Sequence, residues 1–147
     1  MAASNEVFVR LFSMVVAAGV VLAPVFVPPS AAFGAVNFGA FRTPSGAIGC
    51  AYDAASLRCD VAGGIKPLPP RPKSCRLDWG QGFEMGLKGD ASVVCAGDTA
   101  LGGPEVVPYA TTWHRAGLLC ISSEKGLRCN NTDGHGFFVS KAKSYQF

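Results

Sequence analysis

One cysteine spacing occurs twice in this chain, and it limits the fold more than any other feature. The pairs Cys50/Cys59 and Cys120/Cys129 each enclose eight residues, and both segments end in Leu-Arg-Cys. If each segment turns at its midpoint, residues 53–56 and 123–126 form loops whose side chains suit tight turns. Directly opposed residues of an antiparallel pair lie close enough for a disulfide. The spacing therefore predicts two β-hairpins, each closed by its own bridge.

The two remaining cysteines, Cys75 and Cys95, are expected to form a third bridge by local pairing. Six cysteines allow fifteen connectivities, so the local pattern is one of several that the sequence admits. In the chain-entropy treatment each nine-residue loop contributes about 2.6 kcal/mol and the middle loop about 3 kcal/mol. Because a core of this size gives only a modest net stability, we expect every bridge to matter.

The first 32 residues resemble a targeting segment. Residues 11–27 are an unbroken apolar run, and Ser30 and Ala32 fit the small-x-small pattern that precedes cleavage after Ala32. We interpret residues 1–32 as a signal peptide and residues 33–147 as a single cysteine-rich β domain. The alternative is an uncleaved anchor, because the run approaches the roughly 20 residues that span a bilayer. Any membrane contact is expected through this segment alone.

Cysteine usage and charge narrow the class of protein. All six cysteines follow the apolar run, and an even number in a short exported domain is typical of a framework that forms in oxidising surroundings. We therefore expect a secreted protein or one of the extracytoplasmic cell envelope. The net charge of +3 is dispersed, and no basic run with interleaved aromatics occurs. This pattern argues against nucleic-acid binding.

Short apolar runs separated by glycine and proline indicate an all-β fold. Opposed cysteines set the register of the first hairpin, with Ile48 facing Val61 and Tyr52 facing Leu57. Further strands are expected at residues 38–41, 83–87, 91–95 and 137–139, and the chain is expected to end in a basic tail through Lys141 and Lys143 to Phe147. The sequence predicts a small disulfide-stapled sandwich or barrel built from β-hairpins.

Five strings carry a resemblance to a known family. They are Phe41-x-Thr43-Pro44-Ser45-Gly46-x-Ile48-Gly49-Cys50, Cys75-x-Leu77-Asp78-Trp79-Gly80, Cys95-Ala96-Gly97-Asp98-Thr99, Cys120 … Gly126-Leu127-x-Cys129-x-Asn131, and Gly134-His135-Gly136-Phe137-Phe138. In this order and cysteine spacing they resemble an uncharacterised family of exported, cysteine-rich actinobacterial proteins. The chain departs from it at Tyr109-Ala110, where Tyr-Gly is expected. The resemblance implies an exported single domain, a domain of unknown function, with no assigned activity or site residue.

One segment attracts a catalytic interpretation. His135 lies between two glycines, which let a backbone approach closely and expose the side chain between them. His135 would act as a general base that Asp98 or Asp133 orients. The nucleophile would be a hydroxyl, from Ser122, Ser123 or Thr99. The alternative, which we favour, is that His135 hydrogen-bonds within a turn that needs those glycines.

No cofactor or metal is expected. Asn131, Asp133 and Gly134 match part of a calcium loop, but a cysteine occupies the first ligand position and the terminal Glu is missing. The only two histidines, His114 and His135, match no closed zinc motif.

Aromatic side chains beside turns suggest a binding surface. Trp79, Tyr109 and Trp113, together with His135, would stack against a carbohydrate or contact a protein. In a small β domain such side chains also complete the core, so both interpretations stand. We expect a non-catalytic module that binds a protein or a cell-envelope glycan, and more weakly a small secreted hydrolase built on His135.

Overall fold

The structure is a computed structural model, and it describes residues 38–147. Within that range the chain forms two β-sheets from eleven strands and contains no helix. The strands are β1 (Gly39–Arg42), β2 (Ile48–Tyr52), β3 (Ser56–Val61), β4 (Asp78–Gly86), β5 (Ser92–Ala96), β6 (Glu105–Val106), β7 (Thr111–Arg115), β8 (Leu118–Ser123), β9 (Gly126–Asn130), β10 (Gly136–Val139) and β11 (Ser144–Gln146). The expected all-β fold with disulfides is confirmed. The expected signal peptide, residues 1–32, lies outside the described residues.

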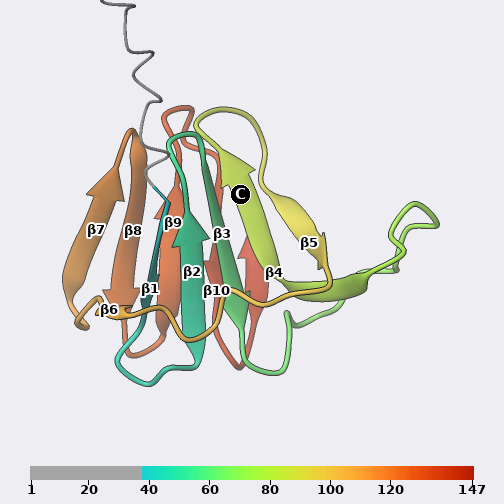
Figure 1. Ribbon diagram of the computed structural model, residues 1–147, viewed down its shortest axis with the longest axis horizontal. Coiled ribbons are helices and arrows are strands. Elements are labelled where there is room, and N and C mark those ends of the chain that lie inside the picture. The colour runs from blue at the N-terminus through green and yellow to red at the C-terminus, as the bar shows by residue number, and fades with distance from the viewer. Residues whose placement is uncertain (1–37) are drawn as a thin grey trace, which may run out of the picture. The chain divides into compact units, whose positions relative to one another are not determined.

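The two sheets pack face to face as a sandwich. The first sheet has the order β5-β4-β3-β2-β1-β6, and the second has the order β11-β10-β9-β8-β7. Figure 1 shows β9 and β10, in orange to red, behind the teal to yellow-green strands β2, β3 and β4. Side chains from both sheets form one hydrophobic core. The chain completes β1 to β6, the whole of the first sheet, before it begins the second, and among the described strands only the short β6 pairs in parallel, with β1.

The first hairpin has the register that the opposed cysteines predict. Ile48 pairs with Val61 and Tyr52 pairs with Leu57. Strand β3 begins at Ser56, so the turn is one residue shorter than expected. Asp53 closes it, because its carboxylate accepts hydrogen bonds of 2.7 Å from the backbone N–H groups of the second and third residues that follow. These bonds, with the one from Ala55 the largest contributor, hold the pKa of Asp53 below its ordinary value.

The end of the chain is a strand and not a tail. Ser144–Gln146 pairs with β10, and the backbone N–H and C=O of Phe147 both bond to Gly136. The expectation of a basic tail was therefore wrong for the last residues. The expectation was based on the two lysines of residues 140–143, which form the turn between β10 and β11. A three-residue strand that follows such a turn carries too few residues to display an alternation.

Each sheet repeats the same row of inward-facing side chains. In the first sheet the row is Phe41, Cys50, Cys59 and Phe83, and in the second it is Trp113, Cys120, Cys129 and Phe137. The two rows meet in the core, where the rings of Phe41 and Trp113 are 4.7 Å apart and those of Phe83 and Phe137 are 5.6 Å apart. The repeated sequence Leu-Arg-Cys is thus part of a repeated four-stranded unit.

Two glycines allow the fourth strand of each unit to approach the third. Gly82 lies against the carbonyl of Cys59, and Gly136 lies against the carbonyl of Cys129. A Cβ at either position would overlap that oxygen. The glycine that precedes the core phenylalanine in each unit is therefore a packing requirement.

Three disulfides hold the described region together. Cys50 is bonded to Cys59, Cys120 to Cys129, and Cys75 to Cys95. The first two cross neighbouring strands within a sheet, and all four of their residues are fully buried. The third joins the segment before β4 to the edge strand β5.

Candidate functional site

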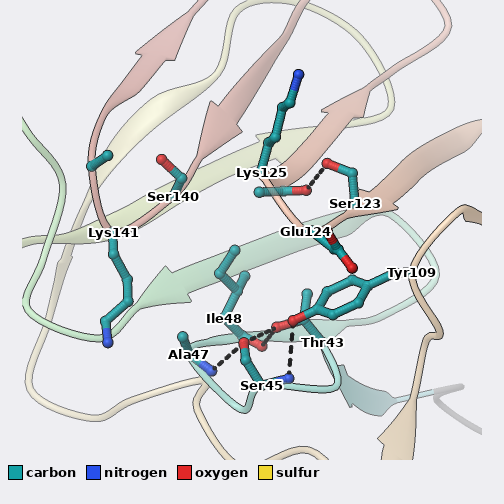
Figure 2. A pocket seen from close by; sticks show the side chains of 12 residues that line it. Thr43, Ser45, Ala47, Ile48, Tyr109, Ser123, Glu124, Lys125, Ser140 and Lys141 are labelled. Atoms are coloured by element: carbon teal, nitrogen blue, oxygen red, sulfur yellow. Dashed lines mark hydrogen bonds between the residues drawn. The ribbon is translucent and has the colours of Figure 1, made fainter.

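A hollow of about 350 Å³ opens at one end of the sandwich, between the turns of the two sheets. Its floor includes buried Ile48, and most of the other lining residues have polar side chains, although their apolar atoms contribute more than half of the exposed lining surface. The side chains that line it come from the β1–β2 turn, the segment before β7, the β8–β9 turn and the β10–β11 turn: Thr43, Ser45, Ala47, Ile48, Tyr109, Ser123, Glu124, Lys125, Gly126, Ser140, Lys141 and Ala142 (Figure 2).

Tyr109 is the aromatic side chain of this hollow. Its ring is partly exposed, and its hydroxyl accepts a hydrogen bond of 3.2 Å from the backbone N–H of Ser45. Figure 2 shows that this bond joins the ring to the β1–β2 turn. The hydroxyl of Ser45 in turn accepts from the N–H of Ala47 at 3.3 Å. The bond between Ser45 and Tyr109 thus connects the segment before β7, the first strand of the second sheet, to the β1–β2 turn of the first sheet.

The residue after Tyr109 adopts a strained backbone. Ala110 has a φ of 60°, in the left-handed region that glycine reaches without strain. Its N–H donates to the carbonyl of Ser122 at 2.9 Å, which fixes the bend before β7. The expected Tyr-Gly of the family pattern therefore has a local physical reason. This chain keeps the conformation with alanine.

Hydroxyls and charges of both signs surround the ring. Ser123 donates to the carbonyl of Gly126 at 2.9 Å. Ser140 donates to the carbonyl of Lys143 at 2.8 Å and accepts from the N–H of the same residue at 3.0 Å. Ser123 therefore keeps both lone pairs for a ligand, and Ser140 keeps one. Glu124 and Lys125 are exposed, and Figure 2 shows them leaving the β8–β9 turn in opposite directions. The hollow can therefore offer acceptors, a carboxylate and an ammonium group to one polar ligand.

The other two aromatic candidates have different environments. Trp79 is partly buried, and its indole N–H donates to the carbonyl of Pro69 at 3.0 Å. Trp113 is only 8% exposed and packs on Phe41 and Tyr52, so placing it on a binding surface was wrong. The signal was present in the sequence. Polar neighbours on both sides of a strand residue indicate that it points to the core.

His135 does not lie beside the acids proposed for it. Its Nδ1 is 3.0 Å from the carboxylate of Asp90, in the turn between β4 and β5, and both side chains are exposed. Asp133 instead accepts from the N–H of Gly89 at 3.0 Å. Asp98 is ion-paired with Arg58 at 2.7 Å. The hydrogen bond from Arg58, and then its positive charge, hold the pKa of Asp98 below its ordinary value.

The candidate hydroxyl nucleophiles are engaged elsewhere. Ser122 is fully buried and donates to the carbonyl of Val107 at 3.3 Å. Thr99 donates to the carboxylate of Asp60 at 3.2 Å. Ser123 belongs to the end hollow described above. The structure therefore brings together none of the proposed base, acid and nucleophile sets.

A family model described as "Family of unknown function (DUF6636)" matches residues 14–147. The chain belongs to this family. No curated protein and no solved structure matches it. The expected membership of an uncharacterised family is confirmed at this level, while export and an actinobacterial source remain predictions.

In this DUF6636 chain the segment around His135 joins the two sheets. Asn131 is buried and donates to the carbonyls of Gly86 and Gly89 at 3.3 and 2.7 Å, and its own amide oxygen accepts from the N–H of Asp133. The next residue, Thr132, donates to the carbonyl of Leu87 through its hydroxyl at 2.6 Å. The segment that contains His135 is therefore held against the β4–β5 turn by these hydrogen bonds. This matches the turn interpretation of His135 more closely than the catalytic one.

Two further features of this DUF6636 chain apply only to residues 38–147. In that range no cluster of three or more His, Cys, Asp or Glu side chains has the geometry to hold a metal ion. The same range has no helix of the length and apolarity needed to cross a membrane.

Proposed function

We propose that this DUF6636 protein is an exported, non-catalytic binding module that holds a terminal sugar of a cell-envelope glycan in the end hollow. The observation that carries the proposal is the Tyr109 ring, fixed between hydroxyls and charges of both signs. The hollow's volume of about 350 Å³ falls within the range of about 300–1,000 Å³ that is typical of small-molecule sites.

The chemistry of the lining supports a sugar ligand. A sugar ring presents an apolar C–H face, which packs on an aromatic ring, and a rim of hydroxyls that need donors and acceptors. Tyr109 supplies the ring, while Ser123 and Ser140 supply oxygens that retain free lone pairs. The charged lining is one carboxylate, Glu124, and two ammonium groups, Lys125 and Lys141, so the hollow can hold a neutral sugar and has at most a weak preference for an anionic one.

The disulfides support the extracytoplasmic part of the proposal. Three bridges in a region of this size are typical of proteins that mature in oxidising surroundings. A binding module in the envelope also benefits from bridges, because no cytosolic chaperone is there to refold it.

The intact mass of the exported protein, taken without reductant, tests the extracytoplasmic location directly. A mass that begins at Phe33 and lacks six hydrogens is expected.

Binding of neutral oligosaccharides tests the hollow. Full chain recovered after export would be titrated with neutral glucan, mannan and chitin-type trisaccharides, and binding would be followed by heat and by amide shifts. Tyr109→Ala should weaken binding at least tenfold, because the ring is the only aromatic face in the hollow. Phe38→Ala removes an exposed aromatic ring that lines neither the hollow nor any neighbouring groove and is the matched control, with no expected change. Equal binding by both variants, or no binding of any neutral sugar, would contradict the proposal.

A small secreted hydrolase is the second candidate. The contact that favours it is the 3.0 Å approach of Asp90 to His135 Nδ1, which is how an acid orients an imidazole base. The engaged hydroxyls described above weigh against it. Hydrolysis of chromogenic acetate and phosphate esters, with His135→Gln as the control, decides between the two. Activity that His135→Gln abolishes would establish the hydrolase, and unchanged background rates would leave the binding module.

A further inference from the structure

The two copies of Leu-Arg-Cys place an arginine at the same position on the outer face of each sheet, but the two arginines have opposite surroundings. In the first sheet Arg58 bonds both oxygens of Asp60, at 3.0 and 2.8 Å, and also Asp98. Its neighbour on β4 is Glu84. Partial burial lowers the pKa of Arg58, but the bonds and charges of Asp60 and Asp98 outweigh this effect and raise it. The first arginine is therefore neutralised within the protein.

The second arginine has no such partners. Asn130 occupies the place that Asp60 has in the first copy, and the cross-strand neighbours of Arg128 are Ile121 and Phe138. Within residues 38–147 Arg128 makes no ion pair. Its guanidinium lies instead over the ring of Phe147, 3.6 Å from the centroid. The positive charge of the second copy is therefore left for an external group.

Arg128 lies in a shallow apolar groove of about 580 Å³ on the outer face of the second sheet. Strand pairing puts Ile121, Arg128, Phe138 and Tyr145 in one row across β8, β9, β10 and β11. Ile121 is 46% exposed and Tyr145 is 42% exposed. The rings of Phe138 and Tyr145 stack with centroids 5.3 Å apart. The two rings are therefore packed against each other in the lining of the groove.

The border of the groove is cationic. Lys125, at the β8–β9 turn, and Lys143, at the β10–β11 turn, line it together with Arg128, and no carboxylate is among its lining residues. The acid nearest in sequence, Glu124, lines the end hollow instead. Three cations beside an apolar floor complement a ligand that has regularly spaced negative charges and flat apolar faces.

We infer that this outer face of the second sheet binds an acidic polysaccharide, a chain of sugar rings that carry carboxylates. Sugar rings would lie on the Phe138 and Tyr145 rings, and carboxylates would pair with Arg128 and the two lysines. A peptide that adds a strand needs free backbone groups at a sheet edge, whereas most of this groove lies over β8, β9 and β10, each of which is paired on both sides. A bilayer favours protruding apolar groups, whereas this surface is hollowed.

The groove adjoins the hollow of the proposed function and shares Ser123, Lys125, Ser140 and Ala142 with it, while Tyr109 lines only the hollow and Lys143 and Tyr145 line only the groove. The probes and variants are chosen to tell the two apart. Full chain would be titrated at low salt with oligogalacturonate of six sugars, and with the same oligomer after complete methyl esterification, which keeps the rings and removes the charges. The acidic oligomer should bind at least tenfold more tightly than the ester. Lys143→Gln should weaken it about three- to fivefold, as expected for an exposed ion pair. Tyr145→Ala should weaken it to a similar extent through lost stacking.

Matched controls keep the test specific to the groove. Lys73→Gln removes an exposed lysine elsewhere and should leave the affinity within twofold. Tyr109→Ala should not change it either, so a failure of the end hollow does not count as a failure here. Equal binding of acid and ester, equal losses in Lys73→Gln and Lys143→Gln, or binding only to anionic phosphatidylglycerol vesicles or to polyglutamate would each overturn the inference.

Discussion

The two Leu-Arg-Cys arginines offer a matched pair of substitutions, Arg58→Gln and Arg128→Gln. Both remove the same charge from the same position of a repeated unit, and both keep a polar side chain of similar length. Asp60, the partner of Arg58, is 1% exposed, whereas Arg128 has no partner acid among the described residues. We therefore expect Arg58→Gln to lower the free energy of unfolding much more than Arg128→Gln does.

The magnitude follows from what each substitution leaves behind. Arg58→Gln strips Asp60 of both guanidinium bonds and leaves the N–H of Ala100, at 2.8 Å, and the hydroxyl of Thr99 as its donors. Breaking a fully buried pair costs about 3–5 kcal/mol. The side chain of Arg58 is 18% exposed, so water can reach part of the site, and we expect a loss of about 2–3 kcal/mol. Arg128→Gln loses one cation–π contact, worth about 0.5–1 kcal/mol.

Thermal and urea unfolding without reductant measure the difference. At about 4 °C per kcal/mol for a domain of this size, Arg58→Gln should lower Tm by about 8–12 °C and Arg128→Gln by less than about 4 °C. The double variant Arg58→Gln/Asp60→Asn should recover part of the loss, because it removes the uncompensated buried charge. Equal destabilisation by the two single variants would refute the reasoning, and so would a double variant that is less stable than Arg58→Gln alone.

Three further predictions concern single features of the fold. Ala110→Gly should raise the unfolding free energy by about 0.5–1 kcal/mol, because glycine adopts the φ of 60° without strain; urea titration checks it, and a loss would show that the alanine methyl packs usefully. Replacing Cys50 and Cys59 by alanine should lower stability by about 2.6 kcal/mol from chain entropy alone, and by more with the two buried sulfur atoms gone, as urea unfolding would report. Asp98→Asn should lower Tm slightly at pH 7. Since the pKa of Asp98 is held below its ordinary 3.8, the extra stability of the wild type is complete above about pH 4 and disappears as the pH falls through the lowered pKa. A Tm difference between wild type and variant that grows on acidification would contradict this.

Much of the fold could be predicted because opposed cysteines fix a register. Cys50 opposite Cys59 settles which residues of the first hairpin face the core, since side chains alternate along a strand. The same reasoning applied to Cys120 and Cys129 puts Ile121 opposite Arg128, so half of the groove row was readable from the sequence. The other half depends on β11, whose three residues display no pattern of their own.

The candidate sites were less predictable because they depend on contacts between distant segments. Nothing local to Asp98 indicates that it pairs with Arg58, 40 residues earlier, and nothing near His135 points to Asp90. Tyr109 was identified for its ring, but its place in a hollow depends on the β1–β2 turn, which is distant in the sequence. Spacing rules describe neighbours in a strand or helix, whereas these sites are assembled by the packing of turns from both sheets.

The burial of the hairpin bridges has a consequence for their chemical lifetime. Disulfide exchange needs a thiolate to reach a sulfur atom, and Cys50, Cys59, Cys120 and Cys129 are fully covered by the two sheets. Reductants can attack these two bridges only when the sandwich opens, so their reduction reports the population of the open form, and at reductant concentrations high enough to outpace reclosing it reports the rate of opening. Cys95 is partly exposed at an edge strand, so Cys75–Cys95 is the bridge that is reduced first in the folded protein. A molecule that has lost this bridge alone would still keep both disulfide-closed hairpins. Such a molecule would be a partly reduced intermediate in degradation that still has its hydrophobic core.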